Sequence, residues 1–97
     1  MNSTESNGSS LDARRRRARF RAWHRGTREM DLLLGRFADA YIASLSDSDL
    51  VGFEAVLELP DPDLFVWITG PGRDLPGSAP PVLRSIRDFY SERHGQD

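Results

Sequence analysis

The apolar residues between positions 30 and 41 follow a helical repeat, and this repeat limits the fold more than any other feature of the chain. Met30, Leu33, Leu34, Phe37 and Tyr41 are spaced at i, i+3, i+4, i+7 and i+11. This spacing places the five side chains on one face of an α-helix, where they can be buried together. The sequence therefore predicts an amphipathic helix that packs against other helices.

Residues at the start of this repeat mark where the helix begins. Gly26 interrupts the preceding pattern, and Thr27 can accept a hydrogen bond from a free amide of the first turn. Glu29 and Asp31 place negative charge at the positive end of the helix dipole. We expect the helix to run from this corner to about Ser44.

Four other segments also carry helical signals, whereas no segment gives a convincing strand. Ser46 and Asp49 have capping-box spacing ahead of an apolar stretch. Asp61 fits an N-cap, with Pro62 at the first helical position, where its missing amide costs nothing. Gly70 with Pro71 then ends this short helix. We expect these four helices at about residues 11–22, 47–59, 62–69 and 80–94, the last one opening at Pro80 or Pro81 and ending near His94 and Gly95.

Five helices with short connections predict an all-α fold, namely a compact five-helix antiparallel bundle. Residues 1–10 are polar and low in complexity, so we expect them to form a disordered N-terminal tail. Residues 11–95 are expected to form a single helical domain. The core of a domain this small supplies only about 3–5 kcal/mol of net stability.

The residues that catalysis or metal binding would need are scarce. The chain of 97 residues has no cysteine, and its only histidines are His24 and His94. Neither histidine belongs to a recognisable nucleophile arrangement, and two histidines so far apart do not make a ligand set with the scattered acids. Neither a Walker pattern nor a G-x-G-x-x-G motif is present. We therefore expect no catalytic residue, no metal and no tightly bound cofactor.

Arginine is concentrated in one part of the chain. Residues 12–28 hold eight arginines and one acidic residue, whereas residues 29–97 hold five arginines and thirteen acidic residues. The run from Arg14 to Arg21 has three interpretations: a footprint for nucleic acid with Phe20 and Trp23 as stacking groups, a helix face that complements the acidic domain, or a docking arm for an acidic protein. The net charge of −2 and the lack of a recognisable nucleic-acid-binding fold weigh against the first.

The polar segment from Arg25 to Glu29 lies between two expected helices. Gly26 can adopt a positive φ and lets another molecule approach the backbone. Arg25 and Glu29 project near a helix N-terminus whose free amides can also bind a partner. Spacing and capping alone favour an ordinary corner between helices, but the same residues also suit a contact surface.

The chain carries five further motifs: W-H-R-G-T-R-E-M-D-L-L-L at Trp23–Leu34, L-S-D at Leu45–Asp47, L-E at Leu57–Glu58, D-P-D-L-F at Asp61–Phe65, and Trp67. Taken together, these motifs resemble a known family, the succinate dehydrogenase assembly factors, or flavinylation factors, of bacteria and mitochondria. The resemblance covers about residues 12–93. The family signature R-G-x-x-E falls on Arg25, Gly26 and Glu29, whereas Arg28 stands where many members carry an aliphatic residue.

The resemblance implies an assembly chaperone rather than an enzyme. Such a protein binds the flavoprotein subunit of succinate dehydrogenase and, in some bacteria, that of fumarate reductase, and it promotes covalent attachment of FAD, which the partner carries. The alternative is a small helical nucleic-acid-binding protein that uses the basic arm Arg14–Arg21. Within Asp61–Phe65, we expect Asp61 to cap a helix, while Leu64 and Phe65 pack. The implied partner-binding residues are Arg25, Gly26, Glu29, Arg17, Arg21, Trp23, His24, Arg28, Met30 and Asp31.

The chain contains no apolar run that reaches the roughly 18 residues of a membrane-spanning helix. We therefore expect a soluble protein with no membrane partner. Separately, we expect a monomer. The bacterial cytoplasm is the expected compartment and the mitochondrial matrix the alternative, because residues 1–11 carry no arginine, whereas mitochondrial targeting segments are rich in it.

Overall fold

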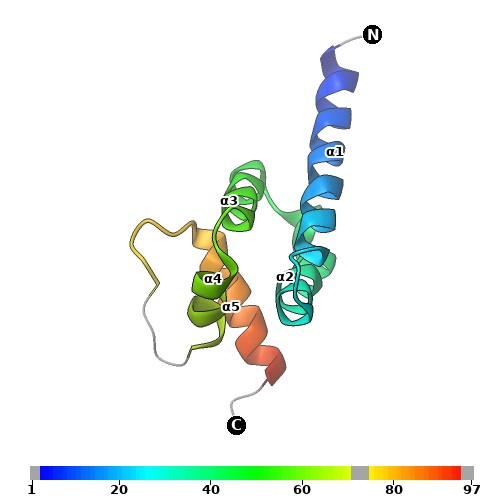
Figure 1. Ribbon diagram of the computed structural model, residues 1–97. Helices are drawn as coiled ribbons and strands as arrows, with labels where there is room; N and C mark the ends of the chain where they lie inside the picture. The colour runs from blue at the N-terminus through cyan, green and yellow to red at the C-terminus, as the bar shows by residue number, and fades with distance from the viewer. Residues whose placement is uncertain (1–2, 71–74, 95–97) are drawn as a thin grey trace.

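Five α-helices pack around one apolar core in the computed structural model (Figure 1). The structure describes the backbone of residues 3–70 and 75–94 and the side chains of residues 10–70 and 75–93. No strand occurs in these ranges, so the prediction of an all-α fold is confirmed. The elements are α1 (Ser3–Trp23), α2 (Arg28–Tyr41), the short 3-10 helix η1 (Ile42–Ser44), α3 (Asp47–Leu57), α4 (Asp61–Thr69) and α5 (Pro81–His94).

The N-terminal part of α1 extends beyond the other helices (Figure 1). We predicted a disordered tail over residues 1–10 and a helix from about Leu11. Met1 and Asn2 lie outside the described residues, and Ser3–Ser10 continue the helix away from the core. Among the described side chains, Leu11 is the first that packs against the core.

The apolar face of α2 lies at the centre of the bundle. Met30, Leu34 and Phe37 are at most 3% exposed. Thr27 caps the helix as predicted, because its hydroxyl accepts a hydrogen bond from the amide of Met30 at 3.3 Å. Tyr41 was expected on the buried face but is 42% exposed, since it is the last residue of α2 before the chain tightens into η1.

The start of α3 follows the prediction, whereas the start of α4 differs from it by one residue. The hydroxyl of Ser46 caps α3 by accepting a hydrogen bond from the amide of Asp49 at 3.1 Å. Pro60, not Asp61, is the N-cap of α4, and Asp61 is the first helical residue. The predicted cap at Asp61 is therefore wrong, because its carboxylate binds the side chain of Arg25 instead.

α5 closes the bundle by packing against α2, α3 and α4. Its buried residues Val82, Leu83 and Ile86 were all expected to face inward. The predicted stop of α4 is confirmed at Gly70, but Pro71 and the following loop to residue 74 lie outside the described residues, as does Gly95 after α5. Across the described ranges, no helix combines the length and the apolar character needed to cross a membrane.

Candidate partner-binding surface

The guanidinium of Arg25 is turned into the molecule, where its side chain is only 11% exposed. Its Nε and Nη2 donate hydrogen bonds to Oδ1 of Asp61 at 2.9 and 2.6 Å. Nη1 also donates to the carbonyl of Leu57 at 2.6 Å, and Nη2 to that of Leu59 at 3.0 Å. Carbonyls at the end of a helix have no helical amide to bind. Arg25 therefore fastens the corner between α1 and α2 to the connection between α3 and α4.

The backbone of the same corner is fixed by a side chain and by a glycine. The amide of Arg25 donates a hydrogen bond to Oδ1 of Asp31 at 2.6 Å. Gly26 has a φ of +121°, which residues with a side chain rarely adopt. No atom lies within 4 Å of the position that a Cβ of Gly26 would occupy. The outer side of the corner is therefore open to another molecule.

The three signature residues thus have different surroundings. Arg25 is held inside the molecule, whereas Gly26 and Glu29 are exposed. Arg28 is also exposed, and neither Arg28 nor Glu29 forms an ion pair with any described residue. Because the carboxylate of Glu29 is exposed and unpaired among the described residues, it can accept charge-assisted hydrogen bonds from a partner. Met30, predicted among the partner-binding residues, belongs to the core at 3% exposure.

Trp23 packs α1 onto α2. A Cβ at Gly35 would lie 2.7 Å from Cε3 of Trp23 and even closer to other ring atoms, so the indole lies directly on the glycine backbone. The indole Nε1 donates a hydrogen bond to Oδ1 of Asp39 at 3.1 Å. Hydrogen bonds from Arg19 and from Trp23 hold the pKa of Asp39 below its ordinary value. Trp23 was predicted to bind a partner, and its contact with Gly35 was not predicted, because this glycine is not part of the apolar helical repeat.

Three arginines of α1 form ion pairs with acidic residues of the domain behind them. The hydrogen bond from Arg14 also lowers the pKa of Glu54. The three ion pairs are those expected for a helix face that complements an acidic domain. They engage much of the positive charge of the basic arm. Arg16 and Arg17 form no ion pair with any described residue. The pairs are Arg14–Glu54 at 2.8 Å, Arg19–Asp39 at 2.6 Å and Arg21–Glu58 at 2.6 Å.

Phe20 and His24 form an exposed aromatic stack at the C-terminal end of α1. Their ring centroids are 3.9 Å apart with an interplanar angle of 19°, and Phe20 is 62% exposed. The ring Nδ1 of His24 donates a hydrogen bond to the carbonyl of Phe20 at 2.7 Å. Arg17 and Arg21 line a shallow depression beside Phe20. Exposed aromatic and arginine side chains are enriched at protein interfaces, so this patch suits contact with a partner.

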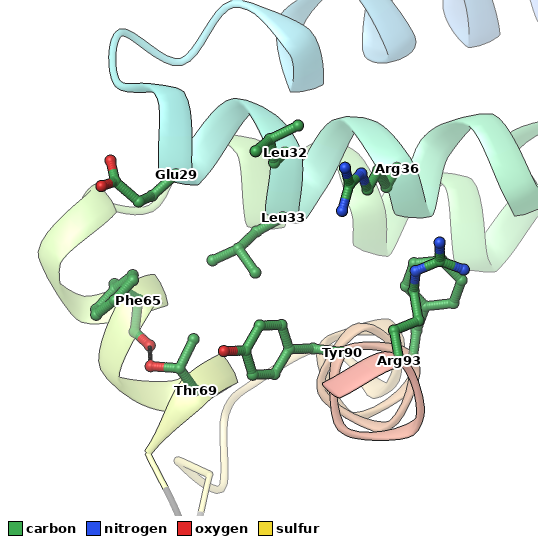
Figure 2. A pocket seen from close by; sticks show the side chains of 9 residues that line it. Glu29, Leu32, Leu33, Arg36, Phe65, Thr69, Tyr90 and Arg93 are labelled. Atoms are coloured by element: carbon green, nitrogen blue, oxygen red, sulfur yellow. Dashed lines mark hydrogen bonds between the residues drawn. The ribbon is translucent and has the colours of Figure 1, made fainter. Parts of the chain in front are cut away.

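A cleft of about 250 Å³ opens between α2, α4 and α5 (Figure 2). Glu29 lies at one end of the cleft, and Arg36 and Arg93 lie at the other. Phe65 was expected to pack in the core together with Leu64. Leu64 is fully buried, but Phe65 is 43% exposed and lines this cleft, so the prediction for Phe65 is wrong. Among the described residues, no group of histidines and acids could hold a metal ion.

The predicted site residues thus divide into two groups. The side chains of the inward group contact other parts of the domain, whereas the residues of the outward group are exposed. Partner binding by these residues stays a prediction. Arg25, Asp31, Met30 and Trp23 form the inward group, and Gly26, Glu29, Arg28, His24, Arg17 and Arg21 form the outward group.

The chain is similar to proteins that are named for flavin assembly. A FAD assembly factor, SdhE, of Acetobacter pasteurianus is 41% identical over 86 residues, which cover 89% of this chain and 79% of that protein. The mitochondrial succinate dehydrogenase assembly factor 2 of Debaryomyces hansenii is 39% identical over 62 residues, which cover 64% of this chain and 44% of that protein. The chain thus spans less than half the length of this mitochondrial relative.

A family model covers most of the domain. The model described as the flavinator of succinate dehydrogenase, Sdh5, matches residues 16–90. These residues include the last eight residues of α1 and the signature corner, Arg25–Glu29. No solved structure matches the chain. The family resemblance noted from the motifs is therefore confirmed, and the chain belongs to the Sdh5 family, the flavinators of succinate dehydrogenase.

Proposed function

We propose that this chain is an assembly factor that binds the flavoprotein subunit of succinate dehydrogenase and promotes covalent attachment of FAD to that subunit. The names of its relatives support this client. The observation that carries the proposal is the signature corner, where Gly26 and Glu29 face outward on a backbone that Arg25 holds from within. A second client, the fumarate reductase flavoprotein, and a monomeric state stay predictions.

The signature corner is suited to binding and aligning the partner rather than to catalysis. The new covalent bond joins the FAD to the partner's own side chain, so this chain needs to supply only binding and alignment. Gly26 leaves room for a partner backbone, and the free carboxylate of Glu29 can bind amides or arginines there. Because the inner contacts of Arg25 fix the corner before binding, little conformational entropy is lost when the partner docks.

The alternative function, nucleic-acid binding by the basic arm, is not favoured. Arg14, Arg19 and Arg21 already pair with acidic residues of the same chain, so these cations would have to break ion pairs before they could bind phosphates. If the arm nevertheless bound nucleic acid, a gel-shift assay would show a complex that weakens steeply as salt increases. We expect no shift.

Co-purification tests the proposed client. The tagged chain is expected to retain the co-expressed flavoprotein subunit. Glu29→Lys is expected to reduce the retained amount by about tenfold or more, because a charge reversal at a contact costs at least about 1.4 kcal/mol. The matched control is Asp88→Lys, which makes the same charge change at an exposed position on α5.

Two results would contradict this proposal. One is a wild-type chain that retains no flavoprotein subunit, and the other is a Glu29→Lys chain that retains as much as the Asp88→Lys control. Far-ultraviolet circular dichroism of each variant shows whether the helices are intact. Glu29 is exposed and has no ion pair with the described residues, so its replacement should leave the fold unchanged.

A further inference from the structure

The cleft between α2, α4 and α5 has an apolar interior and charged ends (Figure 2). Leu33 of α2, Phe65 of α4 and Tyr90 of α5 point into it from its three sides. A volume of about 250 Å³ accommodates one or two apolar side chains but is smaller than a typical pocket for a cofactor. The size therefore favours side chains of a protein segment over a large ligand.

The two arginines at one end of the cleft are available to a ligand. Arg36 is exposed and has no hydrogen bond or ion pair with any described residue. The guanidinium of Arg93 lies 5.2 Å from the centroid of the Phe89 ring, a cation–π contact that leaves its charge uncompensated. Two arginine forks above an apolar floor are suited to a carboxylate attached to an apolar segment.

The opposite end of the cleft continues into the signature corner. Glu29 and Phe65 line both this cleft and a second, more open depression that runs over Thr27, Asp61 and Val66. Phe65 and Val66 are 43% and 42% exposed, so the apolar surface is not confined to the cleft. The depression and the cleft together form one elongated path from the corner to the arginines, and such a path fits an extended chain.

We propose that this cleft is the docking site for a short segment of the flavoprotein partner that carries apolar side chains next to an acidic residue. The inference rests on the proposed function, because the cleft shares Glu29 with the corner that is assigned to this partner. The apolar side chains occupy the space beside Phe65, and the acidic side chain binds Arg36 and Arg93. The cleft thereby extends the interface beyond the signature residues.

Charge reversal at Arg36 tests whether an acidic residue of the partner binds at this end of the cleft. Binding of the full chain to the purified flavoprotein subunit without covalent FAD is measured by calorimetry. Arg36→Glu is expected to raise the Kd at least about tenfold. Arg84→Glu makes the same charge change at an exposed position elsewhere on α5 and is expected to leave the Kd within about twofold. Equal Kd values for the two variants would overturn the inference while leaving the proposed function intact.

Cross-linking identifies the occupant itself. A photoreactive benzoylphenylalanine replaces Phe65 in the full chain, and the same residue replaces Val51, an exposed apolar position on α3, as the control. After irradiation with the flavoprotein subunit, the Phe65 probe is expected to join a segment with apolar residues within a few positions of an aspartate or glutamate. A cross-link to a second copy of this chain, or to a segment without an acidic residue, would overturn the inference.

Binding of the wild-type chain distinguishes a failure of the proposed function from a failure of the docking site alone. If the wild-type chain does not bind the flavoprotein subunit at all, then the proposed function fails and the docking site fails with it. If the wild-type chain binds and Glu29→Lys weakens binding while Arg36→Glu does not, then only the docking site is wrong.

Discussion

Replacing Arg25 with alanine is expected to unfold a large fraction of the protein. The change removes an ion pair to Asp61 and hydrogen bonds to two backbone carbonyls, all made by a side chain that is 11% exposed. Removing one partner of a largely buried ion pair costs about 3–5 kcal/mol. A helical domain of this size has about 3–5 kcal/mol of net stability, so the loss approaches the whole of it. Urea unfolding followed by circular dichroism measures the change.

Two further variants give this measurement its controls. Arg25→Lys keeps the charge but cannot reach Asp61 and both carbonyls with one planar fork, so we expect an intermediate loss of stability. Arg36→Ala removes an exposed arginine and is expected to change the free energy of unfolding by no more than about 0.5 kcal/mol. An Arg25→Ala protein as stable as the wild type would show that the inward contacts of Arg25 contribute little to the free energy of unfolding. Arg25 would then be a candidate for direct contact with the partner.

Replacing Gly35 with alanine is expected to have the second largest effect on stability. The added methyl group would overlap the Trp23 ring, so the indole must move and its hydrogen bond to Asp39 must break. Overpacking of this kind costs about 1–3 kcal/mol, and the lost hydrogen bond to a carboxylate adds to it. Thermal unfolding gives the loss of stability, and tryptophan emission in a Trp67→Phe background shows whether Trp23 becomes exposed.

Two further variants show whether the loss of stability in Gly35→Ala comes from overlap with Trp23 or from the replacement of a glycine by alanine in general. Gly77→Ala is the control, because no atom lies within 4 Å of the position that a Cβ would occupy there. In the double variant Trp23→Ala with Gly35→Ala the overlap is gone, so the combined loss is expected to be smaller than the sum of the two single losses. Additive losses, or an unchanged emission of Trp23 in Gly35→Ala, would contradict the packing described above.

The secondary structure could be predicted where the signals are local. The repeat from Met30 to Phe37 and the caps at Thr27 and Ser46 depend on residues within one or two turns. The structure confirms both caps and the burial of Met30, Leu34 and Phe37, whereas Leu33 is only partly buried because it lines the cleft. The start of α4 could not be predicted in this way. Asp61 has the composition of a cap, but its carboxylate binds Arg25, which is 36 residues away in the sequence.

The candidate site was only partly predictable for the same reason. The motif identified the corner, but motif spacing does not show which side of a corner faces solvent, and Arg25 and Trp23 both face inward. The cleft is lined by residues of three helices, α2, α4 and α5, which are far apart in the sequence. Phe65 is apolar in sequence whether it is buried or exposed, so only the packing of α4 reveals that it lines a surface.

The most direct test of the proposed function is the presence of covalent flavin on the partner. The flavoprotein subunit is co-expressed in a host that lacks its own assembly factor, and flavin fluorescence is read from the subunit after denaturing electrophoresis. We predict a fluorescent band with the wild-type chain and with the control Gly77→Arg, and none with Gly26→Arg, which places a large side chain on the open face of the corner. A band of equal intensity without the chain, or with a folded Gly26→Arg protein, would contradict the proposed function.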